Sequence, residues 1–230
     1  MPNWHRTVSM IGIIISLLAI GTPGLSKVLE STKRLHIDVF YESLCSDSRD
    51  FFINQLRPTI LELAAYIDVD LIPYGKAKTT ILPDTRITST CQHGHEECYG
   101  NRIHACALAL STANNLQKVF FAACLFDEFD TALEMGGEKC SKRLGFNWKD
   151  IRNCANSHLG FALQYNHGIQ TQALKPSVTF IPTIVVDQRQ GDSAEQNIRL
   201  KNFYSVVCRE LKLTMMIPPG VCNVQKKVPA

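Results

Sequence analysis

The sequence predicts an α/β fold in which one sheet is interrupted by a long helical segment. Apolar and polar residues alternate over residues 35–41 and predict a strand, and an apolar run over residues 69–74 predicts a second one after an intervening helix. The pattern stays helical from residue 119 to 172, and strand patterning returns only over residues 177–187. This order fits a thioredoxin-like sheet with an inserted helical subdomain over roughly residues 98–172. We expect the insertion to be disulfide-bonded, because cysteines are spread through it.

The elements around this sheet follow from apolar spacing and from proline. Apolar side chains from Phe52 to Ile67 recur at intervals of three and four, which predicts a helix with one buried face. Pro58 lies within it and lacks an N–H, so a kink or a break is expected there. The basic and threonine-rich residues 76–90 are predicted to form a loop or an irregular edge segment. Residues 200–211 carry the apolar face of a last helix.

The first 26 residues have the pattern of a secretory signal peptide. His5 and Arg6 give a basic start, an apolar run follows over residues 10–20, and Gly24 and Ser26 place small residues at the two cleavage positions. The run is short for a bilayer span, so an uncleaved anchor is the less favoured alternative. We expect one mature domain over residues 27–222 and a tail over residues 223–230, with no membrane association after the signal is removed.

Composition limits the classes of partner. The 230-residue chain is 45% hydrophobic and 20% charged, with a formal net charge of +3. It contains no Lys/Arg block of the nucleic-acid-binding type, so no nucleic-acid partner is expected. All nine cysteines follow the signal segment, and cysteines usually pair in an oxidising compartment. Because nine is odd, one must be left over.

Cys45 is the candidate nucleophile. It stands where the first strand gives way to a helix that opens with Cys45-Ser46-Asp47-Ser48. Unpaired N–H groups and the helix dipole stabilise a thiolate at such a junction. Ser46 and Asp47 suit the first turn, where either can hydrogen-bond free N–H groups. The alternative for Cys45 is an inert buried thiol or an intermolecular disulfide.

Pro182 lies inside the last apolar segment. A proline there argues against a central strand position unless its peptide bond is cis or the strand is an edge. In thioredoxin-like folds a cis-proline before a strand lies opposite the active thiol, and the residue before it offers backbone groups to a substrate peptide. Ile181-Pro182-Thr183 stands where such a loop is expected. A plain edge proline is the alternative.

Residues 91–106 concentrate three cysteines with His93, His95 and His104. Thiolate and imidazole are preferred zinc ligands, so a zinc site is one interpretation. Behind a signal peptide, disulfides are favoured instead. A turn at residues 92–94, held by local hydrogen bonds, is a further alternative.

This segment resembles the signature Cys-Gln-His-Gly-x-x-Glu-Cys-x-x-Asn-x-x-x-x-Cys of the gamma-interferon-inducible lysosomal thiol reductase family. Tyr41-Glu42-Ser43-Leu44-Cys45 also resembles that family's approach to its active site, and the similarity extends over roughly residues 34–222. The resemblance implies a thioredoxin-like fold, reduction of protein disulfides, often at acidic pH, and an endosomal, lysosomal or secreted location. We assign a structural role to the matching residues, which are Cys91, Gln92, His93, Gly94, Glu97, Cys98, Asn101 and Cys106.

The active-site tetrad departs from that family's usual Cys-x-x-Cys, because Ser48 stands in place of the second thiol. An attacking thiolate forms a mixed disulfide that a neighbouring thiol then resolves, and a serine cannot do this. Release must depend on an outside thiol such as cysteine or glutathione, or on a second thiol in the substrate, and no cofactor is expected. The Ser48 hydroxyl is expected to hydrogen-bond the Cys45 thiolate.

If the other eight cysteines form four disulfides, Cys45 is the free one. Their connectivity stays open, although short loops make Cys91–Cys98 and Cys208–Cys222 candidate pairs. We therefore predict a secreted or lysosomal thiol–disulfide oxidoreductase that acts on disulfide-containing proteins. Cys45 is its nucleophile, Ser48 and the helix N-terminus stabilise the thiolate, and Pro182 shapes the substrate groove. The alternative is a family member without turnover that serves as a secreted binding protein.

Overall fold

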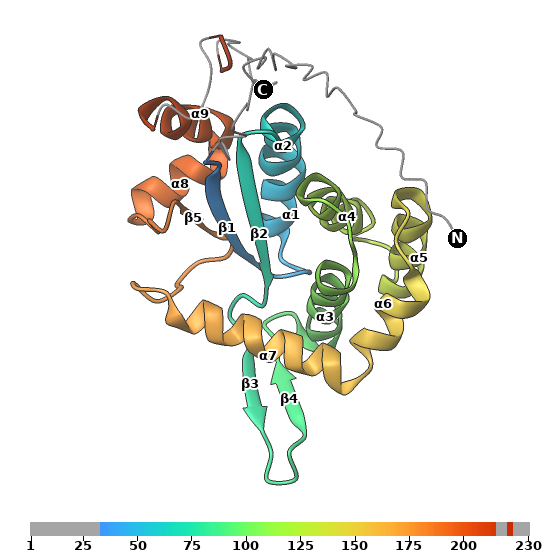
Figure 1. The fold of residues 1–230 in the computed structure, drawn as a ribbon. Coiled ribbons are helices and arrows are strands. Elements are labelled where there is room, and N and C mark those ends of the chain that lie inside the picture. The colour runs from blue at the N-terminus through green and yellow to red at the C-terminus, as the bar shows by residue number, and fades with distance from the viewer. Residues whose placement is uncertain (1–32, 215–219, 223–230) are drawn as a thin grey trace, which may run out of the picture. The chain divides into compact units, whose positions relative to one another are not determined.

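A three-stranded sheet lies at the centre of the computed structural model, which describes residues 33–214 and 220–222 (Figure 1). The strands are β1 (Leu35–Tyr41), β2 (Ile67–Pro73) and β5 (Thr183–Val186), in the order β2-β1-β5. β2 runs parallel to β1 and β5 antiparallel to it, so that Ile37 of β1 is paired with Val69 on one side and Val186 on the other. The predicted signal peptide (1–26) and tail (223–230) lie outside the described residues.

Helices form the rest of the described chain, apart from one hairpin and the connections. A single helical run joins β1 to β2 and comprises α1 (Ser46–Phe51), a π-helical turn η1 (Phe52–Leu56) and α2 (Arg57–Leu63). Five helices lie between the hairpin and β5, and two follow β5. They are α3 (Gly94–Leu110), α4 (Asn115–Asp127), α5 (Leu133–Leu144), α6 (Trp148–Ala155), α7 (His158–Ala173), α8 (Ser193–Lys201) and α9 (Phe203–Leu213).

The main hydrophobic core lies on one face of the sheet. The alternate residues Leu35, Ile37, Val39 and Tyr41 of β1 point into it and pack with apolar side chains of η1, α4 and α9. The Tyr41 ring lies 4.7 Å from Phe52 and 6.0 Å from Phe126, measured between centroids. This period of two is what the sequence pattern predicts for a strand with one buried face.

A second core joins α3, α4, α5 and α6 and contains two disulfides. Cys106 of α3 is bonded to Cys154 of α6, and Cys124 of α4 is bonded to Cys140 of α5. The fold is therefore α/β with a helical, disulfide-bonded insertion, as predicted. Among the described residues, no helix is both long enough and apolar enough to cross a membrane.

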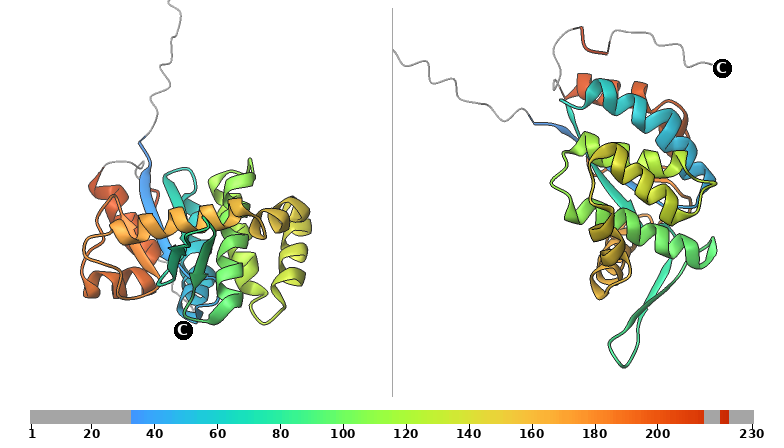
Figure 2. Two further views of the ribbon diagram at one scale, coloured as in Figure 1. Left: turned by 90° about the horizontal axis from the view of Figure 1, so that it is seen from below. Right: turned by 90° about the vertical axis from the view of Figure 1, so that its right-hand side faces the viewer.

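The other face of the sheet packs against the end of α7. Phe40, Ile72 and Val185 form a small cluster there with Leu174, which caps that helix. α7 runs across the strands in the left view of Figure 2. Gly168 permits the close approach, because a Cβ at this position would lie 2.6 Å from the ring of Tyr74.

Residues 78–90 form a β-hairpin, so the loop or irregular edge segment predicted over residues 76–90 is wrong. β3 (Lys78–Ile81) and β4 (Ile87–Thr90) pair with each other and not with the main sheet, from which they extend away (Figures 1 and 2). A hydrogen bond of 2.9 Å between Thr79 Oγ1 and Ser89 Oγ joins the strands. Three of the four residue pairs are polar, and only Ile81 and Ile87 form an apolar pair, so the hairpin leaves no apolar alternation in the sequence.

Two helical segments differ in detail from what the sequence pattern predicts. Of the two alternatives at Pro58, a kink or a break, the break is wrong, because the helical run continues through the proline. The run is not regular, since the π-helical turn η1 directly precedes α2; in a regular helix the proline would meet the carbonyl of Asn54, four residues earlier. The predicted last helix is two helices, separated at Asn202, where φ is −138° and Gln55 Oε1 accepts a hydrogen bond from the N–H of Phe203. The strand predicted over 177–187 is also shorter than expected, since β5 begins after Pro182.

Candidate active site around Cys45

Cys45 occupies the position immediately before α1. Its N–H donates to the Glu42 carbonyl oxygen at 3.3 Å, which closes the turn that leaves β1, and its own carbonyl accepts the first helical hydrogen bond from Arg49. Its backbone is extended, with φ −80° and ψ 123°, and only 8% of its surface is exposed. The thiol therefore lies at the N-terminal end of α1, just below the protein surface.

The odd-count argument about cysteines is confirmed. All nine lie within the described residues, and eight form four disulfides, which leaves Cys45 free. The two pairs suggested by short loops, Cys91–Cys98 and Cys208–Cys222, are present. The three cysteines of residues 91–106 are thus bound in disulfides, so this segment presents no thiolate set for zinc.

The loop before β5 faces the Cys45 thiol. The Ile181–Pro182 peptide bond is cis, and the Cys45 Sγ donates to the Ile181 carbonyl oxygen at 3.8 Å. Phe180 is 45% exposed and borders two hollows, of about 360 and 610 Å³, which also share Asn197 and Leu200. Pro182 could be found from the sequence, whereas Phe180 was missed because its only signal is its place two residues before the proline.

Ser48 does not make the expected hydrogen bond with Cys45. It is completely buried, and its Oγ accepts a hydrogen bond of 3.4 Å from the N–H of Glu42. Ser46 and Asp47 lie in the first turn of α1, as expected, but the residue at the capping position makes no side-chain hydrogen bond to the helix. Cys45 itself occupies the capping position, and its side chain is turned toward Ile181.

The signature residues of α3 hold the turn that leads to Cys45. Asn101 Oδ1 accepts a hydrogen bond of 2.9 Å from the N–H of Ser43, and Ser43 Oγ donates to the Glu97 carbonyl oxygen at 3.1 Å. A Cβ at Gly100 would lie 2.4 Å from Ser43 Oγ, so glycine allows the helix to approach this closely. Residues far apart in the sequence therefore meet at the approach to the thiol.

A buried acidic pair with one histidine lies beside the same turn. Glu97 Oε1 accepts from the N–H of His93 at 3.1 Å, and its Oε2 lies 2.5 Å from His93 Nδ1. Glu42 Oε1 accepts from the N–H of Lys76 at 2.7 Å. Burial raises the pKa of Glu42; the Lys76 N–H opposes this rise, and the nearby charge of Glu97 adds to it. Gly75, at φ +60°, makes room, since a Cβ there would lie 2.1 Å from Glu42 Cγ.

Of the remaining signature residues, Gln92 is exposed in the turn before α3, and Gly94 begins that helix at φ +82°. The Gly94 N–H donates to the Cys91 carbonyl oxygen at 3.3 Å, as the alternative of a local turn predicted.

His104, the third histidine of residues 91–106, lies in the interior. It is buried and shares a hydrogen bond of 2.9 Å with the Tyr41 hydroxyl. Burial lowers the pKa of His104 to about 3 and raises that of Tyr41 well above its usual value.

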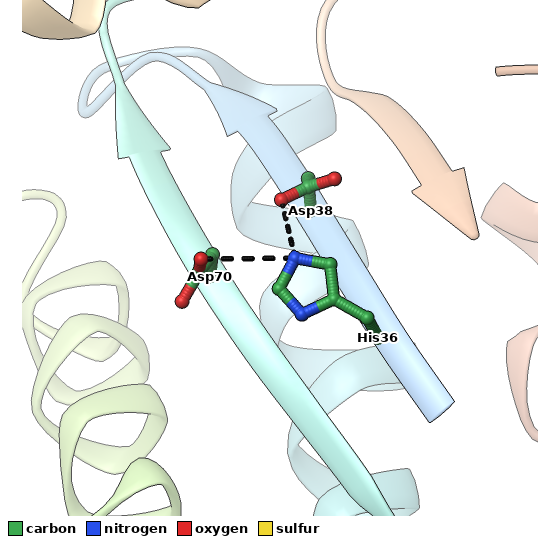
Figure 3. A group of neighbouring side chains, drawn as sticks. All are labelled: His36, Asp38 and Asp70. Carbon is green, nitrogen blue, oxygen red and sulfur yellow. Dashed lines mark hydrogen bonds and ion pairs between the residues drawn. The ribbon is translucent and has the colours of Figure 1, made fainter. Parts of the chain in front are cut away.

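A second cluster of ionisable groups lies toward the start of β1, on the face opposite the main core (Figure 3). His36 Nε2 is 3.0 Å from Asp38 Oδ1 and 3.7 Å from Asp70 Oδ2. Burial raises the pKa of Asp38, while the partly exposed His36 beside it lowers it. No motif in the sequence marks these residues, although all three occupy outward positions of adjacent strands.

The architecture defines a class of protein: a thioredoxin-like α/β fold of the DsbA type with a helical insertion. The crystal structure of Chlamydia trachomatis DsbA is similar to it, with a TM-score of 0.53 over 80% of this chain and 87% of that one, at 15% identity. At this identity the likeness concerns the fold.

Sequence comparison identifies the family. Residues 36–144 match the family described as gamma interferon inducible lysosomal thiol reductase (GILT). GILT-like protein 1 of Drosophila melanogaster is 31% identical over 205 residues, which cover 84% of this chain and 80% of the relative. The gamma-interferon-inducible lysosomal thiol reductase-like protein of Anopheles gambiae is 31% identical over 211 residues, covering 86% and 83%. The chain belongs to the GILT family of thiol reductases.

Proposed function

We propose that the protein is a thiol–disulfide oxidoreductase that acts on protein disulfides through Cys45 alone. The observation that carries the proposal is the free Cys45 thiol at the start of α1, with its Sγ 3.8 Å from the Ile181 carbonyl before Pro182. The eight other cysteines are already paired, so none of them is available to act as a second active-site thiol. Membership of a thiol reductase family supports the same chemistry.

The proposed reaction has two stages. The Cys45 thiolate attacks one sulfur of a substrate disulfide, which forms a mixed disulfide and releases the other sulfur as a thiolate. An external thiol such as cysteine or glutathione then attacks the Cys45 sulfur of the mixed disulfide, which releases the second substrate thiol and leaves Cys45 bonded to the external thiol. A second molecule of the external thiol attacks the external sulfur of this bond, which releases Cys45 and forms the disulfide of the external thiol. In sum, one substrate disulfide is reduced to two thiols, two external thiols become one disulfide, and Cys45 is regenerated.

Resolution from outside is the expected consequence of Ser48. A hydroxyl at this position cannot form a disulfide, so the mixed disulfide persists until an external thiol or a second substrate thiol reaches it. Ser48 Oγ accepts a hydrogen bond from the Glu42 N–H, so Ser48 stabilises the turn that carries Cys45 and supports the thiolate only indirectly. The free N–H groups at the start of α1 supply the direct stabilisation of negative charge.

The substrate is expected to bind beside Phe180 and Pro182. The Ile181 carbonyl already accepts from the thiol, and a peptide laid against this loop would bring its disulfide to the same point. The exposed ring of Phe180 and the adjoining hollows offer apolar surface for such a chain.

We propose that the protein works in the secretory pathway, either in lysosomes or endosomes or outside the cell. Four disulfides and the lysosomal name of the Anopheles relative support this location.

Reduction of insulin with excess cysteine tests the proposal. The purified protein should accelerate precipitation of the insulin B chain between about pH 4.5 and pH 7, and a Cys45→Ser variant should not. Equal rates for the two proteins would rule out turnover. That result would favour the alternative of a secreted binding protein, in which the thiol and the groove capture partners without releasing reduced product.

A second test concerns the single-thiol mechanism. Ser48→Cys should raise reductase turnover, because a neighbouring thiol can resolve the mixed disulfide within the protein. An unchanged rate at saturating external thiol would argue that resolution does not limit the reaction. Alkylation without prior reduction, followed by mass spectrometry, should label Cys45 alone in the parent protein.

A further inference from the structure

We infer that Glu42, His93 and Glu97 form a binding site for a divalent transition-metal ion such as Zn²⁺, beside the turn that carries Cys45. Glu42 Oε2, His93 Nδ1 and Glu97 Oε2 lie within 4.8 Å of one another. Carboxylate oxygen and imidazole nitrogen are both common zinc ligands, and three protein ligands leave a position for water. The inference does not depend on turnover of disulfides.

One atom of this group lacks the partner that its burial requires. Glu42 is 1% exposed, and its Oε2 has no hydrogen-bond partner among the described residues. Its other oxygen is taken by the Lys76 N–H, so Oε2 is the atom left over. The nearest charged partner is His93 Nδ1 at 3.7 Å, which is too far for a hydrogen bond. A buried carboxylate oxygen without a donor is costly, and a cation between Glu42 and His93 would satisfy it.

The geometry needs only a local adjustment. With bonds of about 2.0–2.2 Å, ligands of a tetrahedral zinc ion lie roughly 3.4 Å apart, close to the 3.7 Å between His93 and Glu42. His93 Nδ1 must move away from Glu97 Oε2, which now lies 2.5 Å from it. The imidazole can do this because its side chain is 45% exposed, whereas both carboxylates are held in the interior.

The surroundings fix the two carboxylates in place. Glu97 also accepts from the His93 N–H at the start of α3, and Glu42 is confined by Gly75 and Lys76. A bound ion would therefore tie the turn before Cys45 to the beginning of α3. The cluster of His36, Asp38 and Asp70 lacks these features: its side chains are 41%, 23% and 69% exposed, and none of its atoms is buried without a partner. It serves as the comparison site.

Calorimetric titration of Zn²⁺ at pH 7.5 tests the inference. A Cys45→Ser protein is used throughout, so that a free thiol cannot supply the binding. One ion should bind per chain, and His93→Gln and Glu42→Gln should each weaken the affinity at least about tenfold. His95→Gln is the matched control, because this neighbouring histidine is 84% exposed and pairs with Glu96 outside the cluster; it should leave the affinity unchanged. His36→Gln should also leave it unchanged.

X-ray absorption at the zinc edge provides a readout that does not rely on buried variants. The ion should show only nitrogen and oxygen neighbours at about 2.0–2.1 Å, with no sulfur at about 2.3 Å. Absence of binding at 100 μM Zn²⁺, a sulfur neighbour, or an affinity that His93→Gln does not change would overturn the inference. So would an affinity that falls in the His36→Gln protein instead. Because His93 is half-exposed, its variant should fold even if Glu42→Gln does not.

Discussion

Acidification should destabilise the protein through His104. This imidazole is buried between Tyr41 and Phe126, hydrogen-bonded to the Tyr41 hydroxyl, and its pKa is lowered by burial from 6.5 to about 3. Between these values the unfolded chain binds a proton that the folded chain does not, so stability falls as pH decreases. At pH 5 the unfolded imidazole is almost fully protonated and the folded one is almost fully neutral. Relative to pH 7.5, this difference costs about 2 kcal/mol.

Urea unfolding of His104→Gln at pH 7.5 and pH 5 measures this contribution. Both proteins carry Cys45→Ser, which prevents disulfide exchange. The variant is expected to be less stable at pH 7.5, because glutamine fills the site less well. Its further loss of stability on going to pH 5 should be smaller than that of the parent by about 2 kcal/mol. Exposed His95 provides the control, since His95→Gln should lose as much as the parent. Equal losses for parent and His104→Gln would refute the assignment of a neutral, buried imidazole.

Two further predictions concern the approach to the thiol and the helical insertion. Asn101→Ala leaves the buried N–H of Ser43 without its acceptor, so it should cost about 1–3 kcal/mol in urea unfolding and change the rate of Cys45 alkylation by iodoacetamide. An unchanged alkylation rate would show that this contact does not position the thiol. Replacing both Cys106 and Cys154 by alanine removes a disulfide that spans 48 residues, so the free energy of unfolding should fall by about 4 kcal/mol. A fall below about 1 kcal/mol would mean that packing alone holds α3 to α6.

The fold could be predicted largely because β1 and the helical run after it each bury one face. Alternation in β1 and the spacing from Phe52 onward reflect contacts with the main core, so the sequence carries them directly. The β3–β4 hairpin was missed because its residues are half-buried or exposed, and three of its four residue pairs are polar. The separation of α8 from α9 depends on Gln55, a residue far away in the sequence, and local pattern reasoning has no access to it.

The candidate site, like the fold, could be predicted only where the local sequence carries a signal. Cys45 and Pro182 were found because each breaks a local pattern, and the odd number of cysteines required one free thiol. The predicted bond between Ser48 and Cys45 assumed that neighbours in the tetrad contact each other, whereas the buried turn supplies Ser48 with the Glu42 N–H instead. The role of Glu42 was missed because nothing in the sequence shows that Gly75, Lys76 and His93 surround it.

A cysteine in place of Ser48 would have two effects: it would change the hydrogen bond that supports the turn before Cys45, and it would supply a second thiol. Serine accepts the Glu42 N–H within a fully buried site, and a thiol is a weaker acceptor with a larger sulfur atom. Ser48→Cys should therefore weaken the turn that carries Cys45 by about 1 kcal/mol, even where it supplies a resolving thiol. A gain in turnover together with a loss of stability would mean that the hydroxyl supports the turn while the missing thiol limits the chemistry. If stability is lost without any gain in turnover, Ser48 contributes to this site through the turn alone.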